Sequence, residues 1–327
     1  MARPSQAIPT LDYYFIKAMG LFIASGANPE PSRPIVRLGP YTFVHLRRAV
    51  IFRYVTPNEL DLIRASNPER VYYLIDDMLP LAHACRELPA DYRERLVKFT
   101  REVLPLILDL NPTVVAPSDA ILALFPHHTG ERLDPAYLAV APDRDHFADS
   151  GPLRLAFLGT RSHANGLDFL APILEQVLTG DGDITLTVFF GRHLPTRIAR
   201  LPGVENHAPL PWADYRTRMA AERFHVLLAP LPDTPFNRGR SLTKLMEAAA
   251  TGAALMASDR LPFSTAIEAG RDGLLLGDVA GDWVREIRRL AADREAARIL
   301  AEGTTRLARR IGDPERLGLF WRQRLGL

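Results

Sequence analysis

A lysine and a glutamate three residues apart, Lys244 and Glu247, have side chains suited to binding a phosphorylated sugar or nucleotide. Of the 40 lysine and arginine residues, only Lys17, Lys98 and Lys244 are lysines. A lysine at position 244 is therefore unusual in a chain whose cations are almost all arginines. A compact ammonium suits a confined phosphate site, and a carboxylate accepts hydrogen bonds from a sugar diol. The simpler alternative is an exposed i, i+3 ion pair between the two side chains.

The residues just before this pair are also cationic. Arg238 and Arg240 precede Ser241, which is a good N-cap for a helix that we predict over 241–251. Gly252 would end that helix at its C′ position. The positive helix end and the guanidinium groups together would form a cradle for a diphosphate.

A second loop with similar chemistry follows the apolar run at 153–158. Gly159 and Arg161 could present backbone N–H groups and a cation to phosphate. An ordinary turn between a strand and a helix, capped by His163, is an equally good interpretation.

Two adjacent carboxylates, Asp76 and Asp77, follow the predicted strand 71–75. Carboxylates at the carboxyl end of a parallel strand face the ligand-binding edge of the sheet, where they can orient a hydroxyl or act as a base. We therefore predict them as catalytic residues, with helix capping as the alternative.

Several familiar sites are absent from the sequence. It holds no Walker A loop, GxGxxG, HExxH, CxxC or GxSxG motif. His127 and His128 lack a further ligand at metal spacing, so we predict no metal site.

The net charge of +2 argues against a nucleic-acid partner. Cys85 is the single cysteine and fits a reducing compartment, so we expect a cytoplasmic protein.

No apolar run reaches the roughly 18 residues that a membrane-spanning helix needs. Apolar residues at helical intervals over 11–22, including Phe22, predict an amphipathic helix that packs on the first domain. Its opposite face is not basic, which disfavours a membrane-surface helix. Peripheral contact with the inner face of a membrane remains an open alternative.

Short apolar runs alternate with helical patterns along most of the chain, which predicts an α/β fold with doubly wound parallel sheets. The polar, proline-bounded segment 142–152 is the best linker. We expect a domain over 1–148 and a second over 149–327, with the last helix packing back on the first. The predicted strands are 49–55, 71–75, 113–116, 153–158, 184–190, 225–229 and 253–258, and the predicted helices are 58–66, 91–110, 168–178, 212–222, 241–251 and two beyond 282.

The second half resembles the carboxyl-terminal donor domain of GT-B glycosyltransferases of the group 1, or family 4, type. The resemblance rests on LAFLGTRSH, VENHAPLPWADYRTRMA, HVLLAPL, SLTKLMEAAATGAALMAS and EAGRDGLLL. It implies two Rossmann-like domains facing a cleft and a nucleoside-diphosphate sugar as substrate, without a cofactor. It also implies that Lys244 binds the diphosphate, that Glu247 binds the ribose, and that Arg161 makes a second phosphate contact.

One departure concerns catalysis. The family often carries a carboxylate that contacts the transferred sugar eight residues before Glu247, and Gly239 stands there. The first half is similar to the acceptor domain only through VYYLIDDM, TVVAPSDAIL and APDRDHF, and it lacks the usual Gly-rich opening strand. A protein partner could complete this shorter domain.

The resemblance implies a retaining, metal-independent hexosyltransferase of polysaccharide biosynthesis that acts on a glycan or lipid-linked hydroxyl. The sequence leaves the sugar, the base, the acceptor and the oligomeric state open. The main alternative is a non-catalytic subunit of the same fold that binds a partner or a nucleotide. A nucleotide-sugar epimerase ranks last, because Asp76, Asp77 and His83 are its only acid or base candidates.

Overall fold

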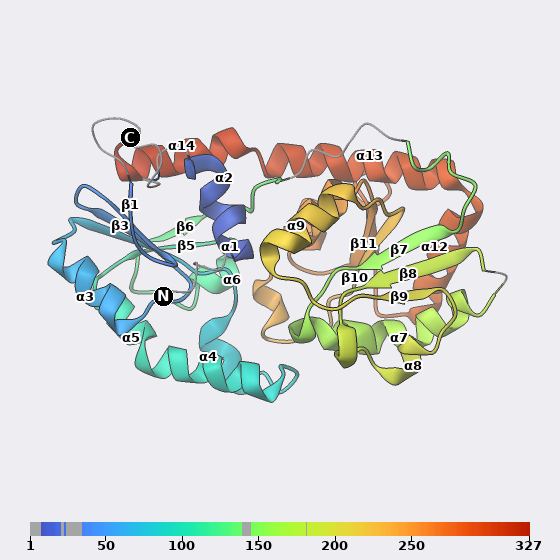
Figure 1. The fold of residues 1–327 in the computed structure, drawn as a ribbon, viewed down its shortest axis with the longest axis horizontal. Helices are drawn as coiled ribbons and strands as arrows, with labels where there is room; N and C mark the ends of the chain where they lie inside the picture. The colour runs from blue at the N-terminus through green and yellow to red at the C-terminus, as the bar shows by residue number, and fades with distance from the viewer. Residues whose placement is uncertain (1–7, 21–22, 24–34, 139–144, 181) are drawn as a thin grey trace.

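The structure is a computed structural model that describes residues 8–20, 23, 35–138, 145–180 and 182–327. Two six-stranded sheets lie side by side, one built from the first half of the chain and the other from the second (Figure 1). This confirms the predicted α/β class. Phe22 and residues 142–144 of the predicted linker lie outside the described residues.

The first sheet has the order β1-β2-β3-β4-β5-β6 and is mixed rather than parallel throughout. Two-residue connections join β1 to β2 and β2 to β3, which permits only antiparallel pairing there. From β3 to β6 the pairing is parallel. The strands are β1 (Val36–Gly39), β2 (Thr42–His45), β3 (Arg48–Phe52), β4 (Arg70–Leu74), β5 (Thr113–Ala116) and β6 (Gly130–Arg132).

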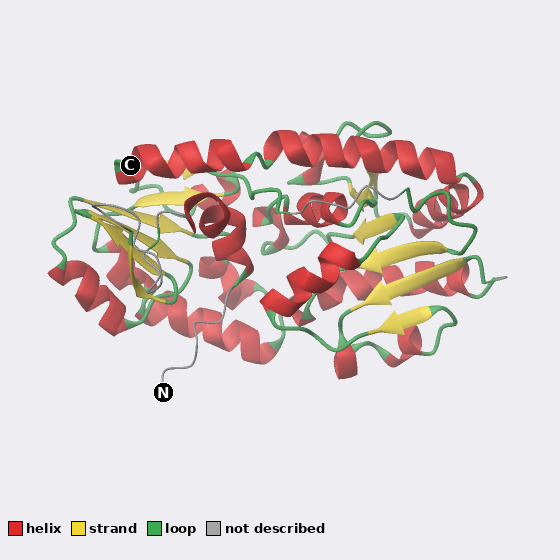
Figure 2. Ribbon diagram, turned by 45° about the horizontal axis from the view of Figure 1, so that its top comes forward, coloured by secondary structure: helices red, strands yellow, loops and turns green. Residues whose placement is uncertain are grey.

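The second sheet is parallel throughout, in the order β12-β11-β10-β7-β8-β9. Its central strands are continuous apolar runs because helices cover both faces (Figure 2). The strands are β7 (Leu153–Phe157), β8 (Ile184–Val188), β9 (Val204–Asn206), β10 (Val226–Ala229), β11 (Ala254–Ser258) and β12 (Leu274–Leu276).

Two pairs of helices pack on the second sheet. Helices α7 (Ala164–Leu178) and α12 (Ala280–Ala292) share one apolar core with it. Helices α10 (Thr243–Ala250) and α13 (Arg294–Ile311) pack against β11 and against each other. The shorter helices of this half are α8 (Thr196–Ala199), α9 (Trp212–Ala221) and α11 (Phe263–Ala266).

The helices of the first half are α3 (Pro57–Ala65), α4 (Ala90–Glu102), α5 (Leu104–Leu108) and α6 (Asp119–Leu122). A single helix over 91–110 was expected, and that prediction was wrong. The chain leaves the helical path at Val103 because Pro105 lacks an N–H and its ring disfavours helix at the preceding residues.

The first described elements are α1 (Pro9–Leu11), a π-helical turn (Asp12–Ile16) and α2 (Lys17–Met19), which together we call the N-terminal helical segment. This confirms the predicted amphipathic helix over its described part. Phe15 is fully buried between Phe43 and Phe52, with ring centroids 4.9 and 5.0 Å away. The segment therefore belongs to the core of the first half.

Three helices, not two, follow position 280, because α14 (Pro314–Leu325) is separate from α13. Together α13 and α14 run along one side of both sheets (Figure 1). Trp321 is fully buried, and its ring lies 5.4 Å from Phe15 and 5.9 Å from Phe52. The end of the chain is thus anchored in the core of the first half.

Candidate functional site

The Lys244–Glu247 pair lies at the start of α10, next to the carboxyl end of β7. The Lys244 ammonium donates a hydrogen bond to the carbonyl of Leu158 and forms an ion pair with Glu247. The two side chains therefore form the i, i+3 ion pair that was the simpler alternative. The pair is not exposed as that alternative expected, because the side chains are only 22% and 11% exposed.

Helix α10 begins at Thr243 rather than at Ser241. The Ser241 hydroxyl lies 2.6 Å from the Thr243 hydroxyl, and it accepts only a long, 3.4 Å hydrogen bond from the Thr243 amide. Leu242 takes the N-cap position because its apolar side chain is buried in the core. At the other end, Gly252 has the positive φ of +69° that a C′ glycine adopts, as predicted.

Aromatic side chains surround the carboxylate of Glu247. The Tyr215 hydroxyl donates to it over 3.4 Å, and Tyr215 stacks on Trp212 with centroids 5.6 Å apart. Tyr13, from the N-terminal helical segment, lies 5.6 Å from Trp212. Burial raises the pKa of Tyr13 and of Tyr215 well above its usual range, and the charge of Glu247 raises both further. Both phenols are therefore neutral hydrogen-bond donors.

Asp12 fixes the N-terminal helical segment against α9. Its carboxylate accepts hydrogen bonds from the Trp212 indole at 2.7 Å and from Arg216 at 2.6 Å. The segment thereby packs on both halves of the chain and covers one side of the Lys244–Glu247 pair.

His163 caps the turn after β7, which confirms the interpretation of His163 as a capping residue. Its Nδ1 accepts a hydrogen bond from the Thr160 amide at 3.3 Å. Burial lowers the pKa of His163 well below its usual value, and the positive charges of Arg240 and Lys244 lower it further. Because Nδ1 accepts the hydrogen bond from the Thr160 amide, the neutral imidazole carries its proton on Nε2.

Gly159 lets this loop pack closely. A Cβ there would lie 2.8 Å from the Phe157 ring and 3.1 Å from the Cβ of His163. Arg161, by contrast, turns toward the first half and forms an ion pair with Asp91 at 2.9 Å. In this structure Arg161 therefore does not join the Lys244 cluster.

Asp76 and Asp77 lie at the carboxyl end of β4, as expected, but both are held in ion pairs. Asp77 accepts from Arg53 at 2.5 Å and from Arg240 at 2.9 Å, which joins the two halves. Asp76 accepts from the Thr10 hydroxyl at 2.7 Å and lies 3.3 Å from Arg53. Burial raises the pKa of Asp76, although the charge of Arg53 opposes this. Asp77 therefore helps to hold the halves together, whereas the contacts of Asp76 lie within the first half.

Gly239, at the position where the resemblance led us to expect a sugar-contacting carboxylate, packs against the first half. A Cβ there would lie 2.3 Å from Cγ of Met78, and the carbonyl of Gly239 accepts a 3.4 Å hydrogen bond from Ser118. Arg238, next to it, is exposed and pairs with Asp233 at 3.1 Å. Met78 thus fills the space that the missing side chain would enter.

The structure brings together Lys244, Glu247, Arg240 and Gly159, with Ser241 two residues before α10, whereas Arg161 and Arg238 point elsewhere. Sequence reasoning missed Tyr13, Tyr215 and Arg53. Tyr215 lies in the stretch PWADY that carried part of the resemblance, which was its only signal. His83, an epimerase candidate, is exposed and 3.1 Å from the carbonyl of Pro80.

Within the described ranges, no group of three or more His, Cys, Asp or Glu residues could hold a metal ion. None of the helices that the structure describes is long and apolar enough to span a membrane.

The sequence matches no protein-family model and no curated protein. Solved structures do match. TarM from S. aureus, in complex with Fondaparinux, alpha-GlcNAc-glycerol and UDP, is 14% identical with a TM-score of 0.56 over 82% of this chain. Because that match covers 54% of TarM, this chain spans about half of TarM's length.

Two further structures match over more of their own length. Sucrose-phosphate synthase from Thermosynechococcus elongatus is 15% identical, with a TM-score of 0.60 over 85% of this chain and 72% of its own. HepE from Anabaena, in complex with UDP and glucose, is 16% identical, with a TM-score of 0.59 over 85% of this chain and 77% of its own. The chain therefore has the fold of the GT-B glycosyltransferases, as its sequence predicted.

Proposed function

We propose that this chain is a glycosyltransferase that moves a sugar from a nucleoside-diphosphate sugar to a hydroxyl of a glycan or lipid-linked acceptor. The observation that carries the proposal is the mostly buried Lys244–Glu247 pair at the start of α10, beside the carboxyl end of β7. Ligands of open α/β sheets bind at such edges. The presence of UDP in the TarM and HepE structures supports a uridine nucleotide as the first donor to test.

In the proposed reaction, the bond between the sugar C1 and the diphosphate oxygen breaks, the acceptor oxygen bonds to C1, and the acceptor's proton passes to the departing diphosphate. The departing diphosphate gains negative charge, which the ammonium of Lys244, the start of α10 and the Nε2–H of His163 would stabilise. Glu247 would accept hydrogen bonds from the ribose. Since Lys244 and Glu247 pair with each other here, ligand binding must separate them.

Several finer features belong to the same proposal. They are transfer of a hexose with retention of configuration, chemistry without a metal or a cofactor, and a cytoplasmic protein with peripheral contact to the inner membrane face. The domain division is 1–148 and 149–327. The first half already holds a six-stranded sheet, completed by the β1–β2 hairpin, so the proposal needs no partner chain to complete it.

A thermal-shift screen of UDP, GDP, ADP, CMP and dTDP and their common sugars tests the proposal. A ligand at 100 times its dissociation constant stabilises the folded state by about 2.7 kcal/mol, so one nucleotide should raise the unfolding midpoint. Lys244→Ala should lose that shift. Lys98→Ala is the matched control, because Lys98 is exposed on α4 and far from the cluster in sequence and contacts. No shift with any nucleotide, or equal shifts in both variants, would contradict the proposal.

The second candidate function is a non-catalytic subunit of the same fold. The observation that favours it is Met78 packed on Gly239, where the family's sugar-contacting carboxylate is missing. A nucleotide that binds but whose sugar is neither transferred nor hydrolysed would favour this function over the transferase.

A further inference from the structure

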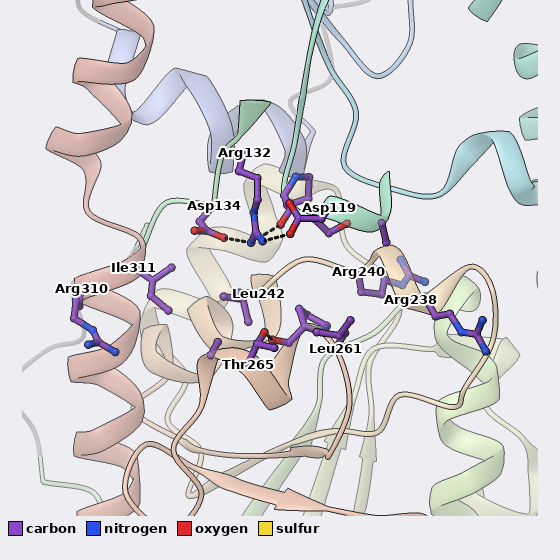
Figure 3. A pocket seen from close by; sticks show the side chains of 15 residues that line it. Asp119, Arg132, Asp134, Arg238, Arg240, Leu242, Leu261, Thr265, Arg310 and Ile311 are labelled. Carbon is purple, nitrogen blue, oxygen red and sulfur yellow. Dashed lines mark hydrogen bonds and ion pairs between the residues drawn. The ribbon is translucent and has the colours of Figure 1, made fainter. Parts of the chain in front are cut away.

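A cavity of about 400 Å³ lies between the two sheets, on the side next to the end of α13 (Figure 3). Its upper wall follows the carboxyl ends of β5 and β6, and its lower wall follows the carboxyl end of β11 and the loop before α10. It is lined by Pro117, Ser118, Asp119, Ala120, Arg132, Asp134, Arg238, Arg240, Leu242, Leu261, Pro262, Thr265, Ala266, Arg310 and Ile311. The cavity therefore adjoins the loop that leads into Lys244.

The charged groups of this cavity are unbalanced. Four arginines and two aspartates line it. Both aspartates face the same arginine, since Arg132 lies 3.3 Å from Asp119 and 3.8 Å from Asp134. The carboxylates of the cavity wall are thus engaged with Arg132, and the other three guanidinium groups have no carboxylate partner in the lining.

Two of those three guanidinium groups have unused donors. Arg240 donates hydrogen bonds from Nη1 to Asp77 and from Nε to Asn237. Its Nη2 is buried without a hydrogen-bond partner among the described residues. Arg310 is exposed and makes no hydrogen bond or ion pair with any residue in the described part of the chain. The exposed guanidinium of Arg310 is therefore free to make charge-assisted hydrogen bonds to an anionic ligand.

The rest of the lining is apolar, through Leu242, Leu261, Pro262, Ala266 and Ile311. Leu261 is 49% exposed, so part of its side chain is open to the cavity. Apolar walls with a few polar groups are typical of small-molecule sites. The C–H face of a sugar ring can pack on such a wall while an attached anion reaches an arginine.

We propose that this cavity binds the acceptor, and that the acceptor is a sugar bearing a carboxylate or a phosphate. The proposal rests on the proposed glycosyltransferase function and narrows its acceptor class. Arg310 would bind the anion, the positive charge of Arg240 would attract it, and Leu261 would contact the ring. The acceptor would then lie on one side of the Arg238–Leu242 loop, and the donor held at Lys244 would lie on the other.

Ligand-observed NMR titration of the full chain with glucuronate, glucose 6-phosphate, inorganic phosphate and glucose tests this site. Both anionic sugars should bind, and glucose should bind at least about tenfold more weakly, as the loss of one charge-assisted contact predicts. The relative affinities of glucuronate and glucose 6-phosphate identify whether the acceptor anion is a carboxylate or a phosphate.

Arg310→Gln should weaken both anionic sugars about tenfold. Arg309→Gln is the matched control, because Arg309 is an exposed neighbour on the same helix that does not line the cavity. Glucose binding as tightly as glucuronate, or equal affinities in the two variants, would overturn the proposal. Phosphate binding as tightly as glucose 6-phosphate would overturn it too, since the site would then take an adventitious ion only.

The same variants also separate this proposal from the proposed function. Arg310→Gln should keep the full nucleotide-induced thermal shift, because Arg310 lies outside the Lys244 cluster. If a nucleotide raises the unfolding midpoint but no anionic sugar binds, only the proposal of an anionic acceptor is wrong. If no nucleotide raises the midpoint, the result counts against the transferase function itself.

Discussion

At the scale of single residues, some buried polar groups of this chain are matched to specific partners. His225 is an example beside the linker. Its Nδ1 accepts a hydrogen bond from the Arg154 amide at 2.8 Å, and its Nε2 lies 3.1 Å from the carbonyl of His146. The neutral ring satisfies both contacts, whereas a protonated ring would turn two N–H groups toward each other at Nδ1.

Burial lowers the pKa of His225 to about 4. An unfolded histidine has a pKa of about 6.5, so the unfolded state binds this proton first as the pH falls. The free energy of unfolding should therefore keep its full value above about pH 6.5 and fall between pH 6.5 and 4, by up to about 1.4 kcal/mol per pH unit from this group.

Urea unfolding at several pH values between 7.5 and 4.5 measures this effect. The comparison is with His225→Asn, whose side-chain oxygen can accept from the Arg154 amide but does not titrate in this range. The variant should show a shallower pH dependence than the parent. Identical pH dependences would show that His225 does not titrate as described.

The sequence identified the residue types of the candidate site better than their contacts. Lys244, Glu247 and Gly159 could be predicted because a rare lysine, a helix pattern and a strand-turn junction mark them. The partners of Arg161 and Arg240 could not, because Asp91 and Asp77 lie 70 and 163 positions away in the chain. Contacts over such separations depend on how the halves pack, which no local pattern encodes.

At the scale of elements, the loop before α10 is fitted to the first half through Gly239. A Cβ at this position would meet Cγ of Met78 at 2.3 Å and Ile121 at 3.0 Å. The glycine therefore permits a close approach between the loop and the first half.

Gly239→Ala should lower the free energy of unfolding by about 1–3 kcal/mol, the usual cost of overpacking. Met78→Ala should remove most of that cost when the two changes are combined, because it vacates the space. Gly281→Ala is the control, since nothing lies within 4 Å of a Cβ there and α12 gains a better helix former. Additive effects of the two changes in urea unfolding would show that Gly239 and Met78 do not compete for this space.

The sequence also predicted some elements better than others. Strands β5, β7, β10 and β11 were predicted to within two residues because they are continuous apolar runs in buried sheets. Strands β1, β6 and β9 were missed because they are three or four residues long and partly exposed at sheet edges. Such strands form through pairing with a neighbour and carry little pattern of their own.

At the scale of the whole molecule, the N-terminal helical segment and α14 meet in the core of the first half. Trp321 of α14 donates its indole N–H to the carbonyl of Tyr14 at 2.5 Å and packs on Phe15 and Phe52. Since α13 packs on the second sheet, α13 and α14 together connect the two halves on the side opposite to α4 (Figure 1).

Trp321→Ala should lower the free energy of unfolding by about 3–5 kcal/mol, as expected for a fully buried tryptophan. Leu319→Ala, on the same helix and 49% exposed, should change it by no more than about 0.5 kcal/mol. Urea unfolding followed by circular dichroism compares the two. A loss at Trp321 as small as that at Leu319 would mean that α14 does not contribute to this core.

The central claim is that the Lys244–Glu247 pair opens to hold a nucleoside diphosphate. Calorimetric titration of UDP into the parent chain, Lys244→Ala, Glu247→Gln and Lys98→Ala tests it most directly. We expect one-to-one binding to the parent and to Lys98→Ala, and at least about tenfold weaker binding to the other two, since each loses a charged contact. Equal UDP affinity in all four proteins would contradict it, as would the absence of binding by UDP and every other nucleoside diphosphate.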